Sequence, residues 1–463
     1  MSTARTEVQP LRAHLANAPA DACLFDRAAR VRLADLVGGT ALGSRLPELS
    51  GRSVLIATAT QLLSALALIE LDGVARRLTI LPPDVNPDHL RALIAGAEID
   101  AVVVDGPASQ FSHLPLCVTC TPHIEPRVDQ PQARARTEWV LLTSGTTGVP
   151  KMVAHSLAGL TAAIATAKRT DPVVWATFYD IRRYGGLQIF LRAVLGGASL
   201  VLSSAGEPVA EHLARLARHG VTHLSGTPSH WRRALMSPDI GKIAPHYVRL
   251  SGEIADQAVL DSLRTAFPRA DIGHAYASTE AGVVFAVDDG RAGFPASFLD
   301  GARNGVEIKT VDGSLRIRSA GAASRYVGAA NTVALRDSDG FVDSGDIVEQ
   351  RGDRCFFVGR KGGIINIGGL KVHPEEVEAV INRHPCVRMS LVRPKRSPFT
   401  GAIVVADVVL TAPSAAAENE AALRDDILKL CRGALPRHKV PAAISFVPAL
   451  AVAATGKLLR RAI

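Results

Sequence analysis

The chain of 463 residues is long enough for two or three domains and a large core. Its 47% hydrophobic and 21% charged residues are ordinary for a globular protein and exclude a disordered chain. The net charge of +8 comes mostly from arginine, without a Lys/Arg block interleaved with aromatic residues, so we expect no nucleic-acid partner. The mild positive field suits an anionic substrate or cofactor instead.

The cysteines and the most apolar stretch also exclude some classes of protein. The six cysteines are scattered, which does not indicate a disulfide framework. Cys117 and Cys120 have C-x-x-C spacing, but no second pair completes a zinc site, so we expect both to be packed side chains. No signal-peptide pattern begins the chain, and residues 54–71 read as a strand and a core helix rather than a membrane span. We therefore expect a cytoplasmic protein.

Strands and helices alternate in the first part of the chain. The first twenty or so residues, rich in Ala and Pro, predict a loosely held lead-in. After them, hydrophobic patterning predicts strands at residues 53–58, 78–81 and 101–104 and helices at residues 87–95, with Asn86 near the cap, and 157–168.

A loop between these elements is dense in hydroxyl groups and glycine. The apolar run from Trp139 to Leu142 predicts a strand end, and it is followed by Thr143, Ser144, Gly145, Thr146, Thr147 and Gly148, with Lys151 beyond them. Hydroxyls and exposed backbone N–H groups are what a loop needs to wrap phosphate oxygens. No G-x-x-x-x-G-K-[ST] spacing fits, so this is not a Walker A loop. The alternative interpretation is a surface linker.

The middle of the chain has the spacing of βαβ units in a parallel sheet. Strands are predicted to begin near Ser199, Val221, Tyr247 and Asp271. Because ligands bind beyond the carboxyl ends of parallel strands, Thr279 and Glu280 stand where a nucleotide should bind. The same Thr-Glu pair could instead cap a helix.

From Gly282 the pattern changes to short strands and hairpin turns. Asp312-Gly313 predicts a turn between strands at residues 306–311 and 315–318, and Asp339-Gly340 predicts a second turn. A smaller α+β unit follows, with helices at residues 374–382 and 421–432 and a strand at residues 402–410. We place the domain boundary so that residues 1–361 form one domain and 362–463 another.

Five segments, in this order, resemble the signatures of the AMP-forming, adenylate-forming superfamily of acyl- and aryl-CoA synthetases. Residues 141–151 and 359–378 carry the specific matches; 276–280, 344–346 and 455–460 are shorter, and a lone Ser-Gly-Asp is a common turn. The resemblance implies an α/β fold. It would have a large N-terminal AMP-binding and acyl-adenylation domain of several subdomains, with parallel βαβ sheets and a distorted β-barrel portion. A small, mobile α+β domain would close it as a lid.

The resemblance also implies roles for individual residues. Tyr276 would stack on adenine, Thr279 would contact the α-phosphate, and Glu280 would hold Mg²⁺. Asp346 would bind the ribose hydroxyls, and Arg360 the ribose and phosphate region. Gly252 belongs to the same nucleotide site, while Thr143 to Thr147 and Lys151 would hold the β- and γ-phosphates.

The C-terminal matches imply parts that move. Gly362 stands at the hinge, where relatives usually carry Asp or Lys, and glycine absorbs large φ/ψ changes cheaply. Gly368 and Gly369 would let the backbone approach the acyl-adenylate and the thiol. Lys457 would offset the repulsion between a carboxylate and the α-phosphate it attacks.

The acyl pocket is expected from residues 177–188, which include Tyr179, Asp180, Arg183 and Gly186. Many relatives carry a histidine in this stretch, and it is absent here. An aspartate resembles amino-acid-activating relatives, whereas arginine would suit an acidic or strongly polar acyl group. The pocket is further expected to include Thr227, from the segment 225–231, and Ala277, which would narrow it because relatives usually have glycine there.

These residues predict an enzyme that activates a carboxylic acid with ATP and Mg²⁺, releases pyrophosphate and passes the acyl group to CoA. Transfer to a carrier-protein phosphopantetheine or to an amine is the nearest alternative. A nucleotide hydrolase is disfavoured by the missing Walker A loop, and a silent nucleotide-binding scaffold by the presence of Glu280, Asp346 and Lys457. We expect small-molecule partners, with an acyl carrier protein as a further option, and no membrane.

Overall fold

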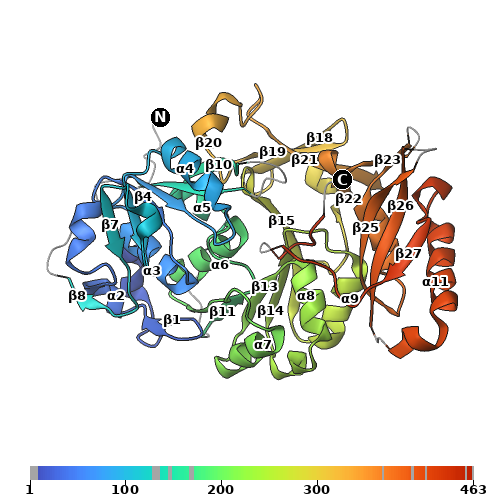
Figure 1. The fold of residues 1–463 in the computed structure, drawn as a ribbon, viewed down its shortest axis with the longest axis horizontal. Helices are drawn as coiled ribbons and strands as arrows, with labels where there is room; N and C mark the ends of the chain where they lie inside the picture. Colours follow the sequence, from blue (N-terminus) through green and yellow to red (C-terminus); the bar gives the residue numbers. More distant parts are fainter. Residues whose placement is uncertain are drawn as a thin grey trace.

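The computed structural model describes residues 9–127, 136–143, 149–165, 172–367, 370–397, 401–411, 414–453 and 456–460. Among the described residues, three large sheets and the two-stranded sheet of β3 (Gly39–Thr40) and β8 (Glu125–Pro126) make up the larger part of the molecule. A smaller part, with a three-stranded sheet, a two-stranded sheet and two helices, lies at the other end of the long axis (Figure 1). The predicted α/β class, with a large and a small part, is confirmed. None of the described helices is long and apolar enough to span a bilayer.

An eight-stranded sheet forms the centre of the larger part. Six neighbouring strands run parallel, and one antiparallel strand closes each edge, in the order β16-β15-β14-β13-β11-β12-β1-β2. The strands are β1 (Cys23–Phe25), β2 (Arg30–Arg32), β11 (Val174–Thr177), β12 (Ser199–Val201), β13 (His223–Gly226), β14 (Tyr247–Ser251), β15 (Asp271–Ser278) and β16 (Gly282–Val287). The connecting helices are α6 (Tyr184–Leu195), α7 (Val209–Arg218), α8 (Pro228–Met236) and α9 (Gln257–Ala266). The predicted βα run is confirmed.

A seven-stranded sheet lies beside it, in the order β20-β10-β9-β5-β4-β6-β7. Its strands are β4 (Ser53–Ile56), β5 (Arg77–Ile80), β6 (Ala101–Val104), β7 (Leu116–Thr119), β9 (Glu138–Leu142), β10 (Met152–Ser156) and β20 (Arg325–Val327). Helix α3 (Gln61–Leu71) is buried along its whole length, which confirms a core helix after the first strand of this sheet. Helix α4 (Pro87–Gly96) has Asn86 as its N-cap, whose side chain accepts from the Asp88 N–H at 3.0 Å.

Two expectations in this region are wrong. The helix predicted over residues 157–168 is α5 (Leu157–Thr161), which ends after five residues. Gly159 and Thr161 are weak helix formers, and the Thr161 hydroxyl donates to the Leu157 carbonyl at 2.8 Å. The described part of the lead-in, from residue 9 onward, is also not loose, because α1 (Leu11–His14) and the following turn bury Leu11 and Leu15 in the core.

The third sheet is curled and antiparallel, in the order β17-β22-β21-β19-β18, and corresponds to the expected distorted barrel portion. Its strands are β17 (Phe294–Pro295), β18 (Val306–Val311), β19 (Ser314–Ser319), β21 (Val342–Arg351) and β22 (Arg354–Arg360). Asp312 and Gly313 join β18 to β19 with φ of 51° and 75°, as a two-residue hairpin turn requires. The Asp337 carboxylate accepts the N–H groups of Asp339 and Phe341 and so stabilises the turn at Asp339-Gly340. No strand directly precedes this turn.

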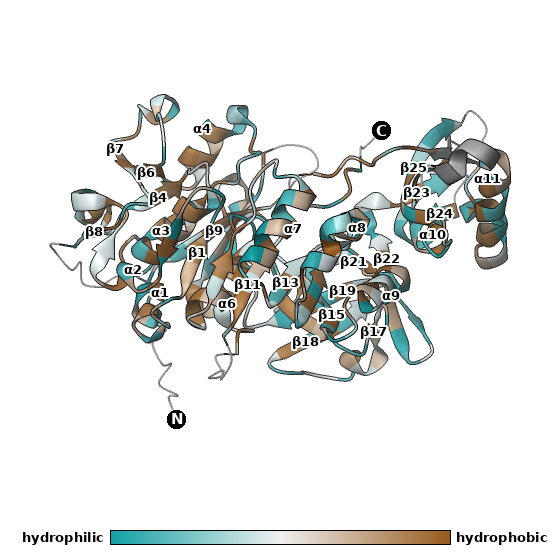
Figure 2. Ribbon diagram, turned by 90° about the horizontal axis from the view of Figure 1, so that it is seen from below, coloured by the Kyte–Doolittle hydropathy of each residue, from teal (hydrophilic) through white to brown (hydrophobic). Residues whose placement is uncertain are grey.

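The smaller part follows a short turn at Lys361–Gly363. It contains β23 (Ile365–Ile367), β24 (Leu370–Val372), α10 (Pro374–Ile381), β25 (Val387–Ser397), β26 (Gly401–Leu410), α11 (Ser414–Ala434) and β27 (Ala443–Phe446). Residues of these elements share a core of their own. Figure 2 shows hydrophilic and hydrophobic stripes on α11, as expected for a helix with one face on that core. The boundary after residue 361 stays a prediction.

Asp72 is a buried carboxyl group that should make folding stability depend on pH. It accepts the Leu11 N–H and the Trp139 Nε1–H, both at 3.0 Å, and burial raises its pKa to about 6. As the pH rises, Asp72 loses its proton near pH 4 in the unfolded chain but only near pH 6 in the folded protein. The free energy of unfolding therefore decreases between pH 4 and 6. Two pH units correspond to about 3 kcal/mol at 1.36 kcal/mol per unit. We expect the unfolding free energy of the wild type, relative to Asp72→Asn, to fall by roughly this amount from pH 4 to 7 in urea titrations. A constant difference would contradict the assignment.

Candidate active site

The predicted nucleotide residues gather at the carboxyl ends of β13, β14 and β15. These parallel neighbours end at Gly226, Ser251 and Ser278, so the residues that follow them share one edge of the sheet. The curled sheet adds Asp346 from β21 and Arg360 from the end of β22, which pair across those strands. The end of the chain runs back from the smaller part to the same place (Figure 1).

Tyr276, Asp346 and Arg360 form one connected group. The Tyr276 hydroxyl donates to one oxygen of Asp346 at 2.5 Å, and Arg360 Nε donates to the other at 2.7 Å. Burial and the Asp346 charge raise the pKa of Tyr276 well above its usual value, so the phenol stays a donor. A carboxylate has about four acceptor positions, which leaves two for a diol.

The Tyr276 ring belongs to an aromatic stack. The Phe357 ring lies 4.7 Å from it at 18°, and the Phe285 ring 5.6 Å from it at 25°. The contact of Tyr276 with adenine stays a prediction, and these neighbours fix the plane of the ring that would make it.

Lys457 enters this site from the C-terminal end of the chain. Its Cε lies 3.5 Å from the position that a Cβ on Gly252 would take, which is ordinary van der Waals contact. Gly252 has a φ of 87°, so the backbone conformation favours glycine there. Burial lowers the pKa of Lys457, and the Arg360 charge lowers it further, whereas Glu253 and Asp346 oppose the shift. The side chain therefore stands among the charged groups of the predicted nucleotide site.

The two ends of the predicted phosphate loop also lie at this site. Ser144, Gly145, Thr146, Thr147 and Gly148 fall outside the described residues. At the loop's ends, the Thr143 N–H donates to the Lys151 carbonyl at 2.9 Å, and Lys151 Nζ lies 5.2 Å from the centre of the Tyr326 ring. Burial raises the pKa of Tyr326, and the Glu280 charge raises it further. Burial lowers the pKa of Arg360, but the charges of Asp346, Tyr276 and Glu280 outweigh it and raise that pKa. Lys151 and Glu280 therefore both lie near Tyr326, and Glu280 also lies near Arg360.

Thr279 and Glu280 lie in the turn between the antiparallel strands β15 and β16. The alternative in which this pair caps a helix is therefore wrong, because no helix follows it. Among the described residues, no group of three or more His, Cys, Asp or Glu side chains is placed to hold a metal ion. Cys120 is buried with its thiol 3.6 Å from the Leu63 carbonyl, which fits the packing role expected for it.

The sequence of the chain matches two protein-family models, one in the larger part and one in the smaller part. The model of the AMP-binding enzyme family matches residues 46–327, which is more than half of the chain. The chain belongs to the AMP-binding enzyme family. The model of the AMP-binding enzyme C-terminal domain matches residues 376–457, so the smaller part of this AMP-binding enzyme is also accounted for.

Curated relatives of this AMP-binding enzyme include CoA ligases. The chain is 28% identical to 4-coumarate–CoA ligase 5 of Oryza sativa subsp. japonica over 69% of its own length and 64% of the ligase. It therefore spans slightly less than two thirds of that relative. It is 25% identical to 2-succinylbenzoate–CoA ligase of Listeria innocua over 79% of each chain.

Solved structures show the same fold. An anthranilate CoA ligase in complex with anthranoyl-AMP superposes with a TM-score of 0.80 at 18% identity, over 97% of this chain and 95% of the ligase. An amide bond synthetase from Marinactinospora thermotolerans superposes with a TM-score of 0.78 at 20% identity, over 97% of each chain. At these identities the likeness shows the fold alone.

The segment expected to line the acyl pocket of the AMP-binding enzyme has a different arrangement from that expected. Both oxygens of Asp180 bind Arg182, at 2.6 and 2.8 Å, and Arg182 is only 1% exposed. Arg182 also donates to the Thr58 carbonyl at 2.7 Å. Asp180 is thus part of an internal ion pair that ties this segment to the seven-stranded sheet, so its charge is already compensated without a substrate ammonium.

Of the other residues predicted for the acyl pocket, Tyr179 and Arg183 make polar contacts, whereas Gly186 and Ala277 pack against neighbouring atoms. Tyr179 donates to the Ser251 carbonyl at 2.8 Å, and Arg183 pairs with Asp84 while its charge reaches Lys457. Gly186 has a packing role, because a Cβ there would lie 2.2 Å from the Asp180 carbonyl oxygen. Ala277 packs beside the core of the larger part. Arg183 therefore remains the predicted polar contact for a substrate.

The predicted hinge lies in the turn Lys361–Gly363 after β22. A Cβ on Gly362 would meet no atom within 4 Å, so packing in this conformation does not require glycine. Gly368 and Gly369 lie outside the described residues. The hinge and thiol-channel roles stay predictions.

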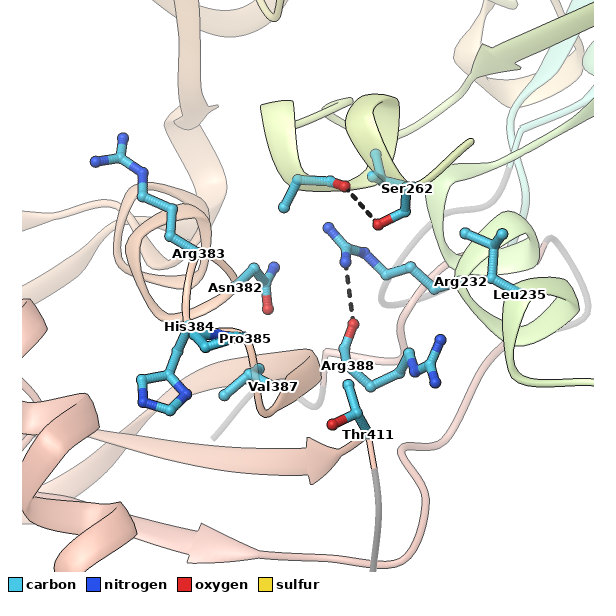
Figure 3. Close-up of a pocket in the computed structure, with 12 residues that line it drawn as sticks. Arg232, Leu235, Ser262, Asn382, Arg383, His384, Pro385, Val387, Arg388 and Thr411 are labelled. Atoms are coloured by element: carbon cyan, nitrogen blue, oxygen red, sulfur yellow. Dashed lines mark hydrogen bonds between the residues drawn. The ribbon is translucent and has the colours of Figure 1, made fainter. Parts of the chain in front are cut away.

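Polar contacts hold the two parts together away from the nucleotide residues. Arg232 of α8 donates to the Arg388 carbonyl at 3.0 Å (Figure 3). Arg232 also pairs with Asp256, and Asn382 Nδ2 donates to Asp256 at 3.3 Å. A cavity of about 180 Å³ lies at this interface, and none of the residues predicted for the site lines it. The interface therefore contacts the small part at a place apart from the predicted site residues.

Sequence reasoning missed Glu253 and His230, which contact the end of the chain. Glu253 follows Ser251-Gly252 at the carboxyl end of a predicted parallel strand, so the rule that pointed to Glu280 applied equally to it. His230 had no comparable signal, because its partner lies 226 positions further along the sequence at Gly456.

Proposed function

We propose that this AMP-binding enzyme is an ATP-dependent, AMP-forming carboxylate ligase. The observation that carries the proposal is the position of Lys457 beside Gly252 and within reach of the charges of Arg360 and Asp346. When a carboxylate attacks a phosphate, two anions approach each other, and a cation between them offsets their repulsion. Lys457, from the C-terminal end of the chain, is placed to supply that cation.

In the first half-reaction the substrate carboxylate attacks the α-phosphate of ATP, acyl-AMP forms and pyrophosphate leaves. Lys457 stabilises the negative charge that builds up between the two anions. Asp346 binds the ribose hydroxyls, and Lys151 with the adjoining loop binds the outer phosphates. Arg360 holds Asp346 in place and adds a cation beside the α-phosphate.

Mg²⁺ fits this site through Glu280. Sites of this kind bind Mg²⁺ with one or two carboxylates together with substrate phosphates, so a single protein carboxylate is a sufficient donor set. When bound, the ion would neutralise phosphate charge.

In the second half-reaction a thiol attacks the acyl carbonyl and AMP leaves. We favour CoA as the thiol because the curated relatives reported above are CoA ligases. An amine acceptor is the second candidate, because a fold neighbour is an amide bond synthetase. A carrier-protein phosphopantetheine is the third.

The test is carboxylate-dependent ATP–pyrophosphate exchange with a panel of acids. Anthranilate, 4-coumarate and 2-succinylbenzoate represent the aryl acids named by relatives, and dicarboxylic, amino and fatty acids complete it. We expect exchange with one class of acid, and then product formation with CoA but not without an acceptor. ATP consumption that needs no carboxylate would support the hydrolase, and ATP binding without exchange for any acid would support the scaffold.

A further inference from the structure

The turn that carries Lys457 rests on three side chains of the larger part. Thr227, His230 and Glu253 contact the backbone of Gly456 and Leu458, on either side of Lys457. We call Thr227, His230 and Glu253 the lysine-turn cradle. All three follow the carboxyl ends of β13 or β14, so the cradle belongs to the same sheet edge as the nucleotide site.

Two members of the cradle bind the peptide groups of the turn. The Thr227 hydroxyl donates to the Gly456 carbonyl at 2.8 Å, and the Leu458 N–H donates to Glu253 Oε1 at 2.9 Å. The other oxygen of Glu253 accepts the Ser229 N–H at 2.9 Å. Because both oxygens of Glu253 accept N–H groups, a carboxylate suits this position better than an amide, which has one oxygen.

His230 supplies the surface under the turn. Gly456 has a φ of 77°, and a Cβ on it would lie 1.8 Å from the His230 ring, so only glycine fits between the ring and the turn. The His230 ring is fixed by stacking on Phe178, at 5.6 Å and 21°, and by accepting the Thr227 N–H at 3.2 Å. Burial lowers the pKa of His230 to about 3, so the ring is neutral near pH 7 and can accept that bond.

The contacts of the cradle are made only to backbone atoms, so they fix where the turn lies without occupying the Lys457 ammonium. The charged groups that act on that ammonium come from four elements: Arg360 of β22, Glu253 after β14, Asp346 of β21 and Arg183 at the start of α6. Glu253 therefore has two effects on Lys457. It holds the adjacent N–H, and its negative charge favours the protonated amine.

We propose that Thr227, His230 and Glu253 are positioning residues that hold Lys457 at the nucleotide for the first half-reaction and release it for the second. The proposal rests on the proposed function, since it assigns the cradle to one half of that reaction. The assignment to one half-reaction distinguishes these three residues from residues that only pack, because the loss of a packing residue would affect both half-reactions equally.

The principal test is Glu253→Gln. One of the two N–H groups then loses its acceptor, and the charge beside Lys457 is removed. We expect ATP–pyrophosphate exchange to fall about 10-fold to 100-fold while thioester formation from supplied acyl-AMP stays within about twofold of the wild type. Glu211→Gln is the matched control, because Glu211 is exposed on α7 and the chemical change is the same. Equal loss in both half-reactions, or no loss of exchange, would overturn the proposal.

The pH profile separates positioning from packing. Glu253 raises the pKa of Lys457, so its removal should lower that pKa, and exchange should be lost at a lower pH in Glu253→Gln than in the wild type. A merely structural defect would reduce the rate without moving the alkaline limb, and an unmoved limb would count against the charge effect.

Two further measurements test the cradle in other ways: a second variant in the turn itself, and a readout that needs no substrate. Gly456→Ala places a methyl group against His230 and should show the same selective loss of exchange. Hydrogen–deuterium exchange of a peptide that contains Leu458 should show faster exchange in Glu253→Gln than in the wild type and Glu211→Gln. This readout needs no turnover, so if the wild type shows no carboxylate-dependent exchange, the proposed function fails while the cradle is still tested. Unchanged protection at Leu458 would overturn the cradle.

Discussion

Replacing Lys457 by alanine should lower carboxylate-dependent ATP–pyrophosphate exchange by about 10²-fold to 10³-fold, the usual cost of removing a group that stabilises transition-state charge. The ammonium lies partly buried among Arg360, Glu253 and Asp346, so water cannot easily replace it. Thioester formation from supplied acyl-AMP should stay near the wild-type rate, because Lys457 leaves the site for that step in the proposed mechanism. Single-turnover measurements of the two half-reactions check this result.

The matched control is Lys429→Ala, which removes an exposed lysine of α11. Both half-reactions should be unchanged in this variant. Equal damage to both half-reactions in Lys457→Ala would contradict the two-conformation mechanism. Unchanged exchange would show that another cation stabilises the attack, and Arg183 would be the first to test because its charge reaches Lys457.

Replacing Asp346 by alanine should weaken ATP binding by about 100-fold. The carboxylate would make two charge-assisted hydrogen bonds to the ribose, each worth roughly 1.5 kcal/mol or more, and 1.4 kcal/mol corresponds to a tenfold change. The substitution also leaves the Tyr276 hydroxyl and Arg360 Nε without their shared acceptor. Calorimetric titration with ATP in the absence of the acid measures the effect directly.

Asp339→Ala provides the control for this experiment. Asp339 lies in a turn near the curled sheet, and its exposed side chain pairs with Lys309 at 3.5 Å, so removing the carboxylate should leave ATP affinity unchanged. Asp346→Asn keeps the shape of the side chain and should retain part of the affinity, which guards against a general loss of folding. Wild-type affinity in Asp346→Ala would contradict the assignment of the ribose site.

The sequence by itself determined those features that depend on neighbouring residues. Asn86 predicted a helix start because a side-chain oxygen two residues away satisfies a free N–H. Asp312 and Gly313 predicted a hairpin because the turn needs positive φ at both positions. The run of βα units predicted the parallel sheet, and with it the edge where Thr279, Glu280 and the unrecognised Glu253 all lie.

Only the tertiary structure decided which partner each polar side chain takes. Asp180 and Arg183 were both candidates for the acyl pocket; Arg182 binds Asp180 from two positions away, and Asp84 pairs with Arg183, which stays the predicted polar contact, from 99 positions away. Glu253 meets Leu458 across 205 positions. Local patterning depends on periodicity and backbone geometry within a few residues, whereas such contacts exist only once the sheets and the smaller part have packed. The position of Lys457 beside Gly252, in the predicted nucleotide site, is therefore a property of the folded chain.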